Sequence, residues 1–99
     1  MTGKAKSMTD RCYAKNPAII ERHGADGPVL IDPYRRMMIT LNPAALEAWR
    51  LLDGTRPVAD IVAALGEQFE VGERELARDI EAFLKELVKR EMVCRCSAV

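Results

Sequence analysis

The dipeptide Asn42-Pro43 divides the sequence into two parts with different hydrophobic periodicity. Upstream, residues 18–23, 28–32 and 37–41 are short apolar runs separated by the turn-forming stretches GADG and PYRR, a pattern that predicts three strands. Asn42 can cap the free N–H groups of a helix and Pro43 fits the first helical position, so we expect the first helix to begin here. A block of strands followed by helices is typical of the α+β class.

Three helices are predicted downstream of this point. We expect the first to end at Gly54, because glycine favours a left-handed cap, and the second to begin with Pro57 at its first position. The third is predicted from about residue 73 to 89, with a continuous apolar stripe made of Leu76, Ile80, Phe83, Leu84 and Leu87. Helices two and three, joined by a tight turn, predict a winged helix-turn-helix-like fold: a three-stranded antiparallel sheet followed by three helices.

Length, charge and cysteine content limit the classes of function. The chain has 99 residues, with 15 basic and 15 acidic side chains, which predicts one small domain without a bulk electrostatic attraction to nucleic acid or anionic membranes. No apolar run approaches the ~20 residues of a membrane span, and the first residues lack the pattern of a signal peptide. Three cysteines are too few and odd in number for a disulfide framework, which indicates a reducing cytoplasm. We expect a flexible basic arm over 1–16, a domain over 17–93 and a tail over 94–99.

The strand predicted over residues 37–41 carries two adjacent methionines that must point to opposite faces. On a period of two, Met37, Ile39 and Leu41 share one face, and Met38 and Thr40 share the other. We expect Met37 to pack inward and Met38 to face a binding groove, where a flexible thioether can adapt to varied apolar partners. The alternative is that both methionines fill gaps beneath a helix.

The third helix carries two charged flanks beside its apolar stripe. Asp79, Ala82 and Glu86 lie on one flank, whereas Arg74, Arg78, Lys85 and Lys89 form a basic stripe on another. We favour the flank with Ala82 as a contact surface, because a small residue leaves room for a partner side chain. The sequence does not decide which flank faces the third strand, and a solvated surface with Glu81–Lys85 pairing is the alternative.

No residue pattern indicates a catalytic, metal or cofactor site. His23 is the single histidine and has no nucleophile motif near it, so we interpret it as a solvated turn residue. Cys94 and Cys96 form C-x-C rather than C-x-x-C, and together with Cys12 they could meet in a metal site only if both ends of the chain folded together. We therefore expect a protein that is not an enzyme and binds neither metal nor cofactor.

An ordered set of segments resembles the family of coenzyme PQQ synthesis protein D, or PqqD. The matching features are an apolar strand ending in DP, ITLN leading into a helix, WRLLDGTRPVADIVAAL and DIEAFLKEL, and the resemblance covers roughly residues 16–93. It implies a peptide chaperone related to the recognition elements of ribosomally made, post-translationally modified peptide (RiPP) pathways. Such a domain holds the leader of a precursor peptide as an added strand beside the third helix, and presents it to a modifying enzyme, often a radical-SAM enzyme. PQQ formation and another RiPP pathway are both compatible with the resemblance.

The predicted peptide-binding residues combine the third strand with one flank of the third helix. They are Met37, Met38, Ile39, Thr40, Leu41, Asp79, Ala82, Phe83 and Glu86. An exposed edge strand supports this hypothesis independently, because its unpaired N–H and C=O groups are a template for a peptide. The same edge would let two copies pair, so a homodimer is an open alternative.

Two rival classes differ in what they would bind. A winged-helix DNA-binding regulator is allowed by the helix-turn-helix, but Glu73 and Glu75 at the start of the third helix and the zero net charge oppose it. A plain oligomerisation domain is the second rival, and it would show itself as a dimer that forms without any partner.

Overall fold

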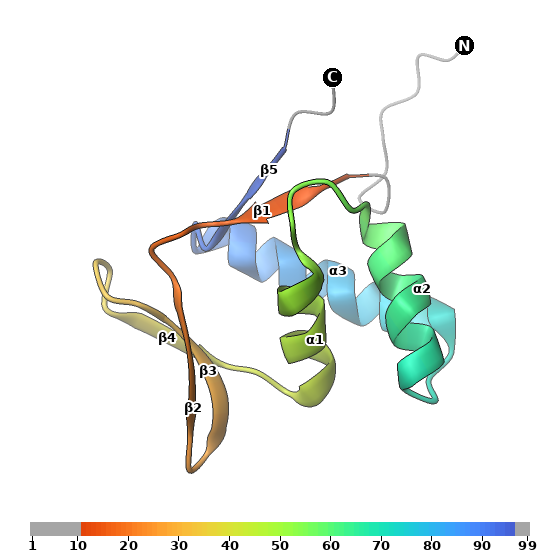
Figure 1. Cartoon of the computed structure of the whole chain (residues 1–99), viewed down its shortest axis with the longest axis horizontal. Coiled ribbons are helices and arrows are strands. Elements are labelled where there is room, and N and C mark those ends of the chain that lie inside the picture. Colours follow the sequence, from red (N-terminus) through yellow and green to blue (C-terminus); the bar gives the residue numbers. More distant parts are fainter. Residues whose placement is uncertain (1–10, 97–99) are drawn as a thin grey trace.

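The computed structural model describes residues 11–96, which form two small sheets and three helices (Figure 1). In chain order the elements are β1 (Tyr13–Lys15), β2 (Ile20–Gly24), β3 (Gly27–Asp32), β4 (Met37–Thr40), α1 (Pro43–Leu51), α2 (Val58–Gln68), α3 (Glu73–Lys89) and β5 (Val93–Arg95). The α+β class is confirmed. Among the described residues, no helix combines the length and the apolar character that a membrane span requires.

The three predicted strands form one antiparallel sheet in the order β2-β3-β4. The hairpin between β2 and β3 turns through Ala25 and Asp26 and enters β3 at Gly27, whose φ of 104° is accessible to glycine at low cost. The longer turn between β3 and β4 is held by Asp32, whose Oδ1 accepts the backbone N–H groups of Tyr34 and Arg35 at 3.0 and 3.1 Å. Figure 1 shows this sheet to one side of the helices, with β3 at its centre.

The first helix begins as predicted but ends earlier. Asn42 Oδ1 accepts the N–H of Ala45 at 2.8 Å, and Pro43 occupies the first turn. The helix ends at Leu51 with Leu52 as its C-cap, so the expectation that Gly54 ends it is wrong. Gly54 instead lies in the connection to α2, where its φ of 86° suits a tight bend. Pro57 is likewise the residue before α2 rather than its first helical residue.

The core lies between the helices and the inner face of β3. α3 has the predicted bounds, and its apolar stripe buries Leu76, Ile80, Leu84 and Leu87, while Phe83 is half-buried against the same cluster. Trp49 of α1 and Leu30 of β3 are buried in this core. α2 and α3 pack against each other, as a helix-turn-helix requires.

The two ends of the described chain pair with each other, which differs from the prediction. Tyr13 lies opposite Arg95 and Lys15 opposite Val93 in an antiparallel ribbon of β1 and β5. The predicted arm over 1–16 therefore includes a strand, and the predicted tail over 94–99 includes part of another; residues 1–10 and 97–99 lie outside the described residues. Figure 1 shows this β1–β5 ribbon crossing above α1, away from the three-stranded sheet.

Candidate functional site

The outer edge of β4 presents main-chain groups that no described strand occupies. Within residues 11–96, β4 pairs with β3 alone. The N–H of Leu41 donates to the carbonyl of Pro28 at 2.9 Å, so the main-chain groups of Leu41 point toward β3. Because hydrogen-bonded and non-hydrogen-bonded pairs alternate along antiparallel strands, the main-chain groups of Ile39 and Met37 also point toward β3. The N–H and C=O groups of Met38 and Thr40 point outward. These outward groups can pair with a further strand.

The side chains of β4 alternate between the core face and the outer face of the sheet. Met37 and Ile39 are half-buried against the core, and Leu41, just after the strand, is 6% exposed. Met38 is 62% exposed, and Thr40 is exposed on the same outer face. The two methionines therefore do not both fill gaps beneath a helix.

Met37 lines a pocket between β4 and α3, and we call it the β4–α3 pocket. It has a volume of about 300 Å³ and is lined by Arg35, Met37, Glu86, Lys89, Arg90 and Glu91. Met38 does not line this pocket, because the strand turns Met37 toward the helix and Met38 away from it. That Met38 contacts a bound partner stays a prediction. The adaptable thioether at this site is that of Met37.

The flank of α3 that faces β4 is the one with Glu86. Asp79 and Ala82 precede Glu86 by seven and four residues, so they extend the same stripe along the helix, and both are exposed. Lys89 belongs to the predicted basic stripe but shares this pocket with Glu86. The helix therefore offers β4 a mixed acidic and basic surface. The Glu81–Lys85 ion pair of the alternative interpretation is not formed among the described residues.

An ion pair links the β3–β4 turn to the end of α3 at the rim of the β4–α3 pocket. Arg35 Nη2 donates to Glu91 Oε1 at 2.6 Å, and Arg35 Nη1 lies 3.4 Å from Oδ2 of the buried Asp32. Glu91 has a φ of 59°, the left-handed conformation of a residue that ends a helix. Sequence reasoning missed Arg35, Arg90 and Glu91 as lining residues, because the contact between turn and helix end joins segments far apart in the chain.

The remaining candidate residues lie outside this pocket. His23 Nε2 is 2.8 Å from Glu21 Oε2, and the hydrogen bond to His23, followed by contacts with Arg50, lowers the pKa of Glu21.

The alternation along β1 and β5 places Cys12, Cys94 and Cys96 on one face of the ribbon. Burial, followed by the nearby thiols, raises the pKa of Cys96, which disfavours its thiolate. No group of side chains in residues 11–96 is arranged to hold a metal ion.

The comparisons with known proteins agree with this geometry. Residues 27–93 match the family "Coenzyme PQQ synthesis protein D (PqqD)", so the chain belongs to the PqqD family. A "PqqA binding protein" of Pseudomonas fluorescens (strain SBW25) is 46% identical over 59 residues, which is 60% of this chain. That match spans 62% of the length of the curated relative.

Two solved structures share the fold. "Lasso peptide synthetase B1 complexed with the leader peptide" is 34% identical with a TM-score of 0.68, over 83% of this chain and 96% of that chain. "TbiB1 in Complex with the TbiA(beta) Leader Peptide" also has a TM-score of 0.68, over 81% of this chain and 93% of that chain, and at 24% identity it shows the fold alone. None of these similar proteins is described as binding DNA, so the DNA-binding alternative has no support from them.

Proposed function

We propose that this protein is a non-catalytic peptide chaperone that binds the leader of a ribosomally made precursor peptide as an added strand on β4. The observation that carries the proposal is the open edge of β4 next to the β4–α3 pocket. A peptide strand there would pair with the outward main-chain groups of Met38 and Thr40 and would direct alternate side chains toward α3. The names of the PqqA binding protein and of the lasso leader complex support this assignment.

The lining of the β4–α3 pocket suggests which types of side chain the bound peptide places there. Met37 gives an adaptable apolar floor, whereas Glu86 and Lys89 provide opposite charges on the α3 side. We infer that the peptide places an apolar side chain toward Met37 and polar side chains toward the helix. In this proposal Asp79 and Ala82 extend the contact along α3, while Ile39, Leu41 and Phe83 support the surface from the core side.

The partner that follows in this proposal is a peptide-modifying enzyme, of the radical-SAM class or another, to which the chaperone presents the bound peptide. The peptide-binding unit corresponds to residues 17–93. A cytoplasmic location belongs to the same proposal and is supported by the small, odd set of cysteines. PQQ formation and lasso-type or other RiPP pathways differ in the precursor, so the precursor that binds identifies the pathway.

A titration with two candidate peptides tests the proposal. We would add synthetic PqqA, and separately a lasso-precursor leader, to the ¹⁵N-labelled full chain and follow its amide resonances. We expect one peptide to shift the amides of Met38 and Thr40 and those around Glu86, with saturation. Shifts confined to other surfaces, or no shift with either peptide, would contradict strand addition on β4.

A charge reversal tests the α3 side of the same site. Glu86→Lys should change the affinity for the binding peptide, because Glu86 lines the β4–α3 pocket. Glu67→Lys on α2 is the matched control, since Glu67 is exposed and does not line that pocket. Equal affinities of both variants and the unmodified protein would place the peptide away from α3.

A further inference from the structure

The β1–β5 ribbon gathers Arg11, Tyr13 and Arg95 at one end of one face. Tyr13 and Arg95 are directly opposite partners, so their side chains lie next to each other on the same face of the ribbon. Arg11 precedes Tyr13 by two residues and therefore shares that face. The carbonyls of Tyr13 and Arg11 accept the N–H groups of Gly54 and Val58, both at 3.0 Å, which fixes the ribbon against the connection between α1 and α2.

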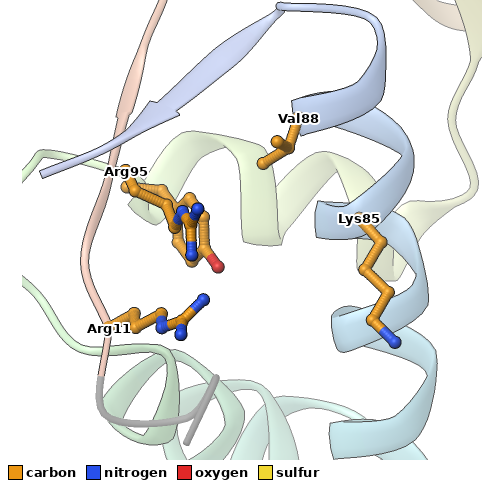
Figure 2. Close-up of a pocket in the computed structure, with 5 residues that line it drawn as sticks. Arg11, Lys85, Val88 and Arg95 are labelled. Atoms are coloured by element: carbon orange, nitrogen blue, oxygen red, sulfur yellow. The ribbon is translucent and has the colours of Figure 1, made fainter. Parts of the chain in front are cut away.

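This face of the ribbon closes over α3 to form a second pocket, which we call the cationic pocket. It has a volume of about 180 Å³ and is lined by Arg11, Tyr13, Lys85, Val88 and Arg95. Figure 2 shows Arg11 and Arg95 extending from the ribbon side, with Lys85 and Val88 on the facing helix. None of these residues lines the β4–α3 pocket.

The cationic pocket contains a buried donor without an acceptor. Tyr13 is 1% exposed, and its hydroxyl has no hydrogen-bond partner among the described residues. Buried polar groups are normally satisfied, because an unpaired buried hydroxyl loses its bonds to water without compensation. A Tyr hydroxyl at this position is therefore unfavourable unless something else provides an acceptor.

The charges around this hydroxyl are also uncompensated. Within residues 11–96, none of Arg11, Lys85 and Arg95 forms an ion pair with a carboxylate, although six arginine–carboxylate ion pairs are formed elsewhere. Three cations around one small pocket repel one another, and an anion between them would remove this repulsion. One kind of ligand, an anion that accepts hydrogen bonds, would satisfy both the unpaired hydroxyl and the unpaired cations.

We propose that the cationic pocket binds an oxyanion, a carboxylate or phosphate group that accepts a hydrogen bond from the Tyr13 hydroxyl. Arg11 and Arg95 donate to it from the ribbon, and Lys85 adds a third positive charge from α3. Guanidinium groups suit this role because their fixed N–H donors match the geometry of carboxylate and phosphate oxygens. Since this pocket is separate from the β4–α3 pocket, it can be occupied while a peptide lies on β4, and it does not depend on the function proposed above.

Conservative variants of the full chain separate anion binding from folding. Tyr13→Phe removes only the hydroxyl and should keep or raise the melting temperature, because the unpaired buried hydroxyl does not stabilise the fold. It should weaken anion binding about tenfold, since a hydrogen bond to a charged acceptor contributes on that order. Tyr34→Phe is the matched control, because Tyr34 is 83% exposed. Arg95→Gln should also weaken anion binding. Arg22→Gln on β2 removes the same charge outside the pocket and should leave anion binding unchanged.

Two probes distinguish the sources of the oxyanion. We would titrate inorganic phosphate, and separately the amide of acetyl-glutamate, into the ¹⁵N-labelled full chain at constant ionic strength. Saturable shifts of the Tyr13 and Arg95 amides with phosphate would support a free phosphate ligand, and shifts with the carboxylate probe alone would support an acidic side chain of a polypeptide. No saturable shift with either probe, or equal binding by Tyr13→Phe and the unmodified protein, would overturn the proposal.

Discussion

Proline at Met38 tests strand addition more sharply than any other single change in β4. The N–H of Met38 points away from β3, so its removal leaves the ladder between β3 and β4 intact. Proline at Ile39 would instead remove a donor to β3 and would disturb the sheet itself. We expect Met38→Pro to fold normally and to bind the precursor peptide much more weakly.

The expected loss follows from the hydrogen bond that the added strand would make. A main-chain hydrogen bond contributes about 1 kcal/mol net, and a peptide carbonyl left buried without a donor costs about 1–3 kcal/mol. The affinity of Met38→Pro should therefore fall by about 5- to 150-fold. A larger loss would indicate that the proline ring also displaces neighbouring parts of the peptide.

The assay is isothermal titration calorimetry with the peptide that binds the unmodified protein, with circular dichroism melting of each variant as the test of folding. His23→Pro is the matched control, because the same alternation points the N–H of His23 outward from the opposite edge of the sheet. We expect His23→Pro to retain its affinity. If a folded Met38→Pro bound the peptide as well as His23→Pro does, β4 would not be the strand that the peptide extends.

Three further predictions concern stability. Leu84 is fully buried, so Leu84→Ala should lower the protein's free energy of unfolding by about 2–5 kcal/mol, as measured by urea denaturation. Backbone N–H groups of Thr55 and Arg56 lower the pKa of Asp53 from 3.8 to about 2, so its stabilising effect is complete above pH 3.8 and is lost as the pH falls toward 2. Asp53→Asn should flatten that part of a melting-temperature profile, and an unchanged slope would contradict this. Glu91→Gly should be about 1 kcal/mol more stable than Glu91→Ala in urea, because only glycine adopts the positive φ without cost.

The elements with long or well-marked patterns were predictable from the sequence. α3 follows a sustained apolar stripe and has the expected bounds, and the start of α1 follows from the chemistry of Asn42 and Pro43. β1 and β5 have three residues each, too few for any periodicity to be visible. Tyr13 therefore looked like part of a basic arm, although it is buried against a partner strand from the other end of the chain.

The alternation of side chains along β4 was predictable from the sequence, but the side of β4 that faces α3 was not. The period of two correctly separates Met37 from Met38, but it does not say which face of the sheet α3 covers. That choice depends on how the helix crosses the sheet, which is a property of the packed core. The ion pair between Arg35 and Glu91 was invisible for the same reason, because it joins a turn to a helix end.

The β1–β5 ribbon also has a consequence for the order of folding during synthesis. Next to it, the Asn16 side chain donates to the carbonyl of Glu91 across a separation of 75 residues, whereas the β2-β3-β4 sheet and the three helices are built from local contacts. Closing so long a loop costs chain entropy that is recovered only when both ends are present. On the ribosome, β1 must therefore wait until β5 has emerged. We expect ribbon amides in pulse-labelling refolding experiments to gain protection after those of α3, and simultaneous protection would contradict this order.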